Sequence, residues 1–259
     1  LSVSISADGK YISAGSKDNK AYLFNKDSNT PLWSYTNGEY FADAAISLDG
    51  QYITASDWDG RLYLFSKDSS TPLWIFQSGG IMRVDISSDG EYIVAASNDN
   101  YFYLFNKDSN ESLWNYTDGH QAWAIVISSD GEYIAAASDP QGADANLYFF
   151  NRANNTPLWN TTIGSTWPKL SISQYGNYLA TSAHYGPVSL FNKNSNEPLW
   201  QYSFNESGGW AVSISADGQY IAACLEEDSS NRLLFWHRDS DTPLWSSNAK
   251  DDEYVLSTK

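Results

Sequence analysis

The stretch Ser47-Leu48-Asp49-Gly50-Gln51-Tyr52 decides the fold, because its pattern, Ser-Xaa-Asp-Gly-Xaa-Tyr, recurs along the whole chain. Further copies begin at Ser6, Ser87, Ser128 and Ser215, and a weaker one at Ser173 carries Tyr175 in place of Asp. Asp-Gly is a strong signal for a β-hairpin, because both residues can take a positive φ. Each copy is therefore expected to hold a hairpin.

A second motif, Leu-Trp, closes each copy. Its Trp residues are about 40 to 45 positions apart, at Trp33, Trp74, Trp114, Trp159, Trp200 and Trp245. In five copies Pro precedes this pair, at Pro31, Pro72, Pro157, Pro198 and Pro243. Proline cannot donate to a β-ladder, so it belongs at a strand start or on an edge. We therefore expect the Pro-Leu-Trp segment to be the outer strand of each sheet, with Trp packed against the next sheet.

Each repeat contains four strand-like runs, which predicts an all-β propeller of four-stranded antiparallel blades. Examples of the four runs are Val3–Ile5, Tyr92–Ala96, Tyr22–Phe24 and Pro31–Trp33. A single domain is expected over residues 1–252, with six repeats at about 1–40, 41–80, 81–121, 122–166, 167–208 and 209–252. The tail, 253–259, leaves an alternative open. Glu253–Ser257 could begin a further first strand, in which case the native array has seven or more blades.

The residues resemble two families of repeat propeller. The run Val-Xaa-Ile-Ser-Xaa-Asp-Gly-Xaa-Tyr looks like the first half of WD-type repeats, and Tyr22–Trp33 resembles the repeat of pyrroloquinoline-quinone (PQQ) propellers. Together these resemblances cover nearly the whole chain, and they imply a prokaryotic surface protein, archaeal or bacterial. They also raise the alternative of a quinoprotein-like enzyme. Quinone-binding members generally have eight blades, an adjacent pair of cysteines and calcium ligands, whereas this chain has six repeats and one Cys. We therefore expect no enzyme, no cofactor and no metal.

Composition narrows the possible partners. The formal net charge of −16 argues against nucleic acid, because binding phosphates requires a basic surface. No apolar run approaches the length of a membrane span, so we expect no direct membrane insertion. An acidic surface suits an extracellular or cell-surface segment of a larger protein, with the cytoplasm as the alternative. Five glycosylation sequons, about as many as chance gives, permit such a location without establishing it, at Asn110, Asn115, Asn154, Asn160 and Asn205.

Comparison of the six copies separates two ends of each blade. The turns between strands one and two and between three and four carry the repeated motifs, and we call this the repeating end. The turns between strands two and three and the connections between blades differ from copy to copy, and we call this the variable end. Both insertions, Asp139–Asn146 and Glu226–Asn231, fall at the variable end. Specific binding is expected there.

The residues just before each first strand are the candidate binding set, because they would ring the mouth of the central channel. They are Phe41, Asp43, Met82, Arg83, Trp123, Trp167, Lys169 and Trp210. Aromatic residues with a few charges suit a peptide, a sugar or a planar ligand. The alternative is that these side chains fill the channel and pack between blades. Trp58 and Tyr101 could extend the surface.

The remaining candidates for chemistry are few. His120 and His184 map to the variable end and could touch a ligand, whereas His237 lies in a turn where most copies carry Asn. Cys224 occupies a position filled by small residues in the other copies, which predicts an unreactive thiol. The acidic run Glu226-Glu227-Asp228 lacks the spacing of a calcium loop.

These observations favour a non-catalytic scaffold that binds a protein, a small ligand or a glycan. One alternative is a structural repeat unit of a surface assembly. The other is the quinoprotein-like enzyme. The residues leave the oligomeric state open.

Overall fold

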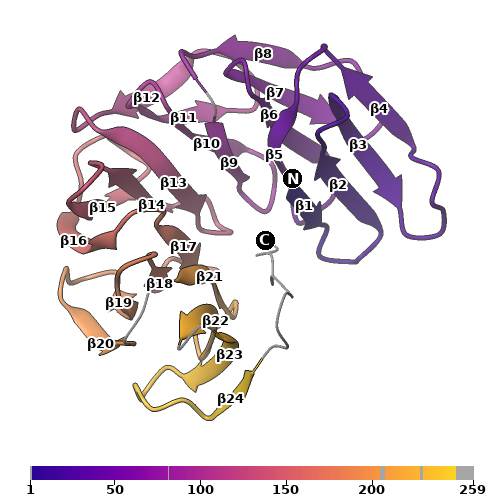
Figure 1. Ribbon diagram of the computed structural model, residues 1–259. Coiled ribbons are helices and arrows are strands. Elements are labelled where there is room, and N and C mark those ends of the chain that lie inside the picture. The colour runs from indigo at the N-terminus through magenta and orange to yellow at the C-terminus, as the bar shows by residue number, and fades with distance from the viewer. Residues whose placement is uncertain (1, 81, 205–207, 228–229, 249–259) are drawn as a thin grey trace. The chain divides into compact units, whose positions relative to one another are not determined.

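The computed structural model describes the chain apart from residues 1, 81, 205–207, 228–229 and 249–259. The described residues form 24 β-strands in six four-stranded sheets, and in every sheet the strands lie in chain order (Figure 1). The predicted all-β fold of four-stranded antiparallel blades is confirmed. None of the described residues belongs to a helix long and apolar enough to cross a membrane. The residues that could begin a seventh blade, 253–257, lie outside the described part.

The structure divides into two compact units, made of the described residues of Leu1–Gly131 and of Glu132–Ser257. The first unit contains β1 (Ser2–Ile5), β2 (Tyr11–Gly15), β3 (Lys20–Asn25), β4 (Trp33–Thr36), β5 (Phe41–Ile46), β6 (Tyr52–Asp57), β7 (Arg61–Ser66), β8 (Trp74–Gln77), β9 (Met82–Ile86), β10 (Tyr92–Ser97), β11 (Phe102–Asn106), β12 (Ser112–Tyr116) and β13 (Gln121–Ile127).

The second unit contains β14 (Tyr133–Asp139), β15 (Asp144–Asn151), β16 (Trp159–Ser165), β17 (Lys169–Ile172), β18 (Tyr178–Ser182), β19 (Val188–Asn192), β20 (Pro198–Tyr202), β21 (Gly209–Ile214), β22 (Tyr220–Glu227), β23 (Ser230–His237) and β24 (Trp245–Asn248). The two insertions lengthen the hairpins β14–β15 and β22–β23. The expectation of a single domain over 1–252 stays a prediction.

The core of each unit lies between neighbouring sheets, which cover both faces of the middle strands. In β6 every residue after Tyr52 is buried, and in β10 every residue after Tyr92 is buried. Both strands contain small buried residues, such as Ala55 and Ala95, which let the sheets approach closely. The outer strands β4 and β8 instead alternate between half-buried and exposed residues.

In four sheets the repeated Trp ties the sheet to the next one, as the sequence predicted. The Nε1–H of Trp33 donates to the carbonyl of Lys67 at 2.9 Å, and its ring lies 5.2 Å from the ring of Phe65. The same hydrogen bond joins Trp74 to Lys107 (2.8 Å), Trp159 to Lys193 (2.8 Å) and Trp200 to Arg238 (2.7 Å). The indole therefore makes an apolar contact with the next sheet, and its directional hydrogen bond fixes how the ring is oriented there.

Two details of the predicted strands are wrong. The outer strands β4, β8, β16 and β24 begin at the Trp and not at the Pro two residues before it, and only β20 begins at its Pro. In the Asp-Gly turns only Gly has a positive φ, for example +71° at Gly50. The reason is that Gly50 N–H donates to the carbonyl of Ser47 at 2.8 Å, which makes Gly50 the last residue of a four-residue turn, with Leu48 and Asp49 at its centre.

Side chains on the first strands fasten neighbouring blades near their inner edges. The Asp43 carboxylate on β5 accepts from the Ser2 hydroxyl at 2.6 Å and from the backbone N–H of Val84 on β9 at 3.0 Å. Asp85 likewise accepts from Ile127 N–H at 3.0 Å. First strands have one edge without a ladder partner, and these bonds satisfy donors along that edge.

Candidate functional site

At the repeating end, the polar groups of the Ser-Xaa-Asp-Gly-Xaa-Tyr motif hydrogen-bond to one another. In the turn after β5, the Ser47 hydroxyl donates to Asp49 Oδ1 at 2.6 Å, and the same carboxylate oxygen accepts from Gln51 N–H at 2.9 Å. Tyr52 N–H donates to the Ser47 hydroxyl at 3.0 Å. The Ser–Asp hydrogen bond recurs at Ser6, Ser87, Ser128 and Ser215. These polar groups satisfy one another, so the motif maintains the fold.

Most of the exposed aromatic side chains lie at the variable ends of the sheets. Eight aromatic side chains are exposed among the described residues, and five of them lie at the variable ends of the sheets. Three belong to the first unit, namely Tyr40, Trp58 and Tyr101, and two to the second unit, Trp167 and Tyr185. Large exposed rings are costly for a soluble surface unless something covers them, so these rings are the natural candidates for contact with a partner.

Phe41 and Asp43, two of the predicted site residues, face inward. Phe41 is fully buried at the start of β5, where its ring lies 5.4 Å from that of Tyr63. Asp43 is only 6% exposed, and its carboxylate makes the hydrogen bonds between first strands described above. Both side chains therefore support the scaffold, as the alternative interpretation of these positions allows.

Met82, Arg83 and Trp123 lie on neighbouring first strands of the first unit. Met82 is the first residue of β9 and pairs with Ser97 in the ladder. The Arg83 guanidinium lies over the Trp123 ring, with Cζ 5.8 Å from the ring centroid, so it is attracted by the electron-rich face. Arg83 and Trp123 are both half-buried, and they are the predicted pair that the structure brings together in this unit.

Trp167 and Trp210 belong to an aromatic cluster of the second unit, around His184. The imidazole of His184 is 5.0 Å from each of these two indoles, and the ring of Tyr185 packs edge-on against it at 4.4 Å. Trp167 is 43% exposed and Tyr185 59%, so the cluster has an open side. Lys169 begins the adjacent strand β17 and pairs with Ser182. The sequence placed His184 at the variable end, but it did not predict its place between the two Trp residues.

The backbone that presents Trp167 is strained and held in place. Thr166 and Trp167 have φ values of +58° and +51°, which bulky side chains rarely adopt. The segment is fastened to the turn after β18, because Ser165 and Tyr185 exchange two backbone hydrogen bonds and His184 N–H donates to Thr166 O at 3.0 Å. Strain of this kind persists only where its surroundings enforce it, and it concentrates at functional sites.

Two polar atoms of the same cluster are buried without hydrogen-bond partners among the described residues. They are Nδ1 of His184 and Nε1 of Trp210. An unsatisfied buried polar group costs roughly 1–3 kcal/mol, so most native structures avoid it. The cluster thus combines strain, exposed rings and unsatisfied polar atoms, and it is our principal candidate for a contact site in the second unit.

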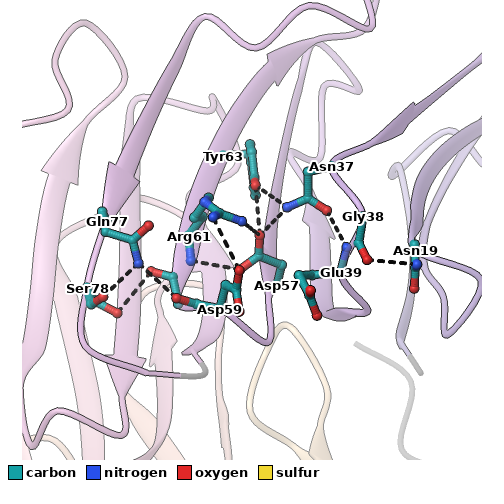
Figure 2. A network of polar contacts seen from close by, with 11 residues as sticks. Asn19, Asn37, Gly38, Glu39, Asp57, Asp59, Arg61, Tyr63, Gln77 and Ser78 are labelled. Carbon is teal, nitrogen blue, oxygen red and sulfur yellow. Dashed lines mark hydrogen bonds and ion pairs between the residues drawn. The ribbon is translucent and has the colours of Figure 1, made fainter.

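In the first unit, a buried carboxylate organises the variable end of the second sheet (Figure 2). Asp57, at the end of β6, is fully buried, and Oδ2 accepts from the Tyr63 hydroxyl at 2.7 Å and from the Asn37 amide. Arg61 donates to both oxygens of this carboxylate. Its backbone N–H donates to Oδ1 at 2.9 Å, and its guanidinium donates to Oδ2 at 3.3 Å. Burial raises the pKa of the Tyr63 hydroxyl, and the hydrogen bond to Asp57 raises it further.

This network holds the segments that carry Tyr40 and Trp58. Trp58 N–H donates to Tyr40 O at 3.0 Å, and the two rings meet at 5.6 Å with an interplanar angle of 76°. The sequence suggested Trp58 as an extension of the surface but missed both Tyr40 and the network. A signal was present, because Asp57 stands where three other copies have Ser, at Ser16, Ser97 and Ser138.

The remaining titratable candidates, His120, His237 and Cys224, belong to neither of the two clusters described above. His120 is exposed, and the ring of His237 packs against Tyr220 at 5.5 Å with its Nδ1 facing the turn. Cys224 is half-buried on β22, and burial raises the pKa of its thiol. Within the described ranges, no three His, Cys, Asp or Glu side chains gather closely enough to hold a metal ion.

Sheets of four antiparallel strands, joined by a repeated Trp and a repeated Ser–Asp turn, define a repeat-built β-propeller. The model of the PQQ-repeat family described as outer membrane protein assembly factor BamB matches residues 2–247, so the chain belongs to that family. The predicted resemblance to PQQ-type propellers is therefore confirmed. No curated protein matches the chain.

Proposed function

We propose that this chain is a non-catalytic scaffold that binds a partner through the variable ends of its sheets. The observation that carries the proposal is Trp167, an exposed indole on a strained connector that two hydrogen bonds between Ser165 and Tyr185 hold in place. A rigid, exposed aromatic side chain is a typical anchor, because it buries much area and loses little conformational entropy on binding. The family name, which describes an assembly factor, agrees with a role in binding.

The setting we propose is a larger extracellular or cell-surface protein, with the cytoplasm as the alternative. The acidic composition supports this setting, and the sequons permit it. Immunolabelling of intact and permeabilised cells distinguishes the two compartments, because only a surface protein is labelled without permeabilisation.

The chain lacks residues that a quinoprotein-like enzyme would need. The chain has a single cysteine, Cys224, and cannot supply the adjacent pair that the resemblance implies for quinone-binding members. Addition of quinone and calcium to the purified protein is expected to give neither a bound chromophore nor dehydrogenase activity.

Trp167 and Trp245 give a matched test of the binding proposal. Both are exposed side chains of the second unit, 43% and 47%, but Trp245 begins the outer strand β24, away from the variable end. A photo-reactive amino acid at position 167 should cross-link one specific component of a surface extract, whereas the same residue at 245 should not. Trp167→Ala should abolish capture of that component and leave the melting temperature nearly unchanged. Equal cross-linking from both positions would exclude the variable end as the binding surface.

A second candidate is a structural unit of a surface assembly. Each sheet exposes one Leu beside its outer-strand Trp, at Leu32, Leu73, Leu113, Leu158, Leu199 and Leu244. Exposed apolar side chains that recur beside the outer strand of each sheet favour contact between copies. Light scattering separates the two candidates, because assembly predicts a mass that rises with concentration and falls when Leu73 and Leu113 are changed to Ser.

A further inference from the structure

Tyr40 and Trp58 form an exposed aromatic corner at the variable end of the second sheet. Tyr40 is 41% exposed and Trp58 48%, and their rings stand nearly perpendicular. The rings meet edge to face, and both side chains keep surface open to solvent that a partner group can contact. Such an arrangement suits a cation, which is attracted to the negative faces of aromatic rings.

The corner is organised before any ligand arrives. Asp57 fixes both chain segments that carry the rings, because it accepts from Asn37, three residues before Tyr40, and from Arg61, three residues after Trp58 (Figure 2). Asn19 of the preceding sheet holds the Tyr40 segment from the other side, with Nδ2 donating to Gly38 O at 2.8 Å. A site built in this way loses little entropy on binding.

Charges around the corner are negative in excess. Glu39 directly precedes Tyr40 in the chain and Asp59 directly follows Trp58. With Asp57 they make three carboxylates against the one guanidinium of Arg61. Arg61 is already paired, with Asp57 at 3.3 Å and with Asp59 at 3.2 Å. The local balance is therefore two negative charges in formal terms, which complements a positive ligand and disfavours an anionic one.

We propose that the Tyr40–Trp58 corner binds a basic side chain, an arginine guanidinium or a lysine ammonium, from a partner polypeptide. This inference rests on the proposed binding role of the variable ends and names the chemistry that one of them recognises. The protein uses the same contact internally, since Lys193 lies 4.7 Å from the Tyr133 ring centroid and Arg238 lies 4.7 Å from that of Tyr178. A neutral sugar could also stack on exposed rings, and the test distinguishes it.

The probe is an acetylated and amidated tetra-arginine peptide, and its control is the same peptide with citrulline, which has the shape of arginine without the charge. Binding is followed by NMR on the backbone amide and indole N–H signals of the ¹⁵N-labelled chain, so that binding is still observed in variants without the Trp58 indole. We expect the arginine peptide to shift the Trp58 signal, with the citrulline peptide at least about fivefold weaker. Binding should weaken several-fold when NaCl is raised from about 0.05 to 0.5 M, because salt screens exposed charges.

The repeats supply the matched variants. Trp58→Asn copies the third repeat, which has Asn98 at the equivalent position, and it should remove the peptide-induced shifts at the second sheet. Tyr101→Asn, at the variable end of the next sheet, should leave them unchanged. If Trp58→Asn lowers the melting temperature, Trp58→Phe is the second variant. It keeps a ring with a weaker attraction for cations and should give an intermediate affinity.

Equal binding of the citrulline peptide, or unchanged binding by Trp58→Asn, overturns the proposal. A neutral oligosaccharide that shifts the Trp58 signal independently of salt assigns the corner to sugars and also overturns it. Both results leave the scaffold role standing if a cross-linker at position 167 still captures its component. Failure of that capture, with peptide binding intact, would refute the Trp167 surface and not the corner.

Discussion

Gly90 lies so close to the ring of Tyr52 that a Cβ atom on residue 90 would stand 2.3 Å from Cδ2 of that ring. The two residues belong to successive copies of the same Ser-Xaa-Asp-Gly-Xaa-Tyr motif. The pairing recurs for Gly50 with Tyr11, Gly131 with Tyr92, Gly176 with Tyr133 and Gly218 with Tyr178. The motif therefore does more than turn a hairpin, because its Gly receives the Tyr of the preceding blade.

Gly90→Ala is expected to lower the free energy of unfolding by about 2–4 kcal/mol, from left-handed backbone strain and the clash with Tyr52 together. Gly9 is the control, because its φ of +67° is similar but nothing lies within 4 Å of a Cβ placed there. Gly9→Ala should cost only about 1–2 kcal/mol, the strain alone. Urea unfolding followed by circular dichroism measures both variants. Equal losses would mean that the contact with Tyr52 is unimportant.

Trp74→Phe tests the hydrogen bond between sheets. The substitution removes the donor to Lys107 O and part of the buried ring, so we expect a loss of about 1–3 kcal/mol. Trp245→Phe makes the same chemical change where the indole is 47% exposed and stacks on Phe235, so it should cost less than half as much. A comparison of melting temperatures decides, and a smaller effect at position 74 would contradict the anchoring role.

Asp8 should remain ionised in acid well below the usual range. The hydrogen bond from the Lys10 side chain, with backbone and Ser6 hydrogen bonds, lowers the pKa of this carboxyl from 3.8 to about 2. The pKa of Asp8 is lower in the folded chain than in the unfolded chain. The ionised carboxylate therefore stabilises the folded state fully above about pH 4, and this stabilisation is lost as the pH falls toward 2. Carbon-13 NMR of the carboxyl group gives the midpoint directly. Lys10→Met should raise that midpoint, whereas Lys17→Met should leave it unchanged.

The architecture was predictable because its determinants repeat. Chance rarely produces five copies of the Ser–Asp–Gly turn, a weaker sixth, and six copies of Leu-Trp, and each copy has the same packing requirements. The site was less predictable, because it depends on residues that occur once. Trp167 could be predicted as a variable-end residue, but its exposure depends on two successive positive φ values that no Gly announces. Phe41 looked equivalent in sequence, yet its side chain turns into the core.

Asp57 shows which signal can be recovered from such a sequence. A carboxylate in place of the Ser found in other copies is visible by aligning the repeats, and a buried charge requires partners. The identity of those partners was not visible, because Asn37 precedes Asp57 by 20 residues and comes from the connection between two blades. Only the folded arrangement brings Asn37, Arg61 and Tyr63 to one carboxylate.

Thr166→Gly tests whether the Trp167 connector is strained for the sake of binding. A β-branched residue at a φ of +58° costs roughly 1–2 kcal/mol, and Gly removes that cost while losing part of the gain to greater freedom when unfolded. We expect a net stabilisation of about 0.5–1 kcal/mol in urea unfolding.

Thr162→Gly, in the regular strand β16, should instead destabilise by about 1 kcal/mol. Cross-linking from position 167 should fall in Thr166→Gly, because a freer connector no longer holds the indole in one orientation. If Thr166→Gly destabilises as much as Thr162→Gly, the positive φ is not a store of strain, and the backbone at Trp167 is simply the relaxed path between β16 and β17.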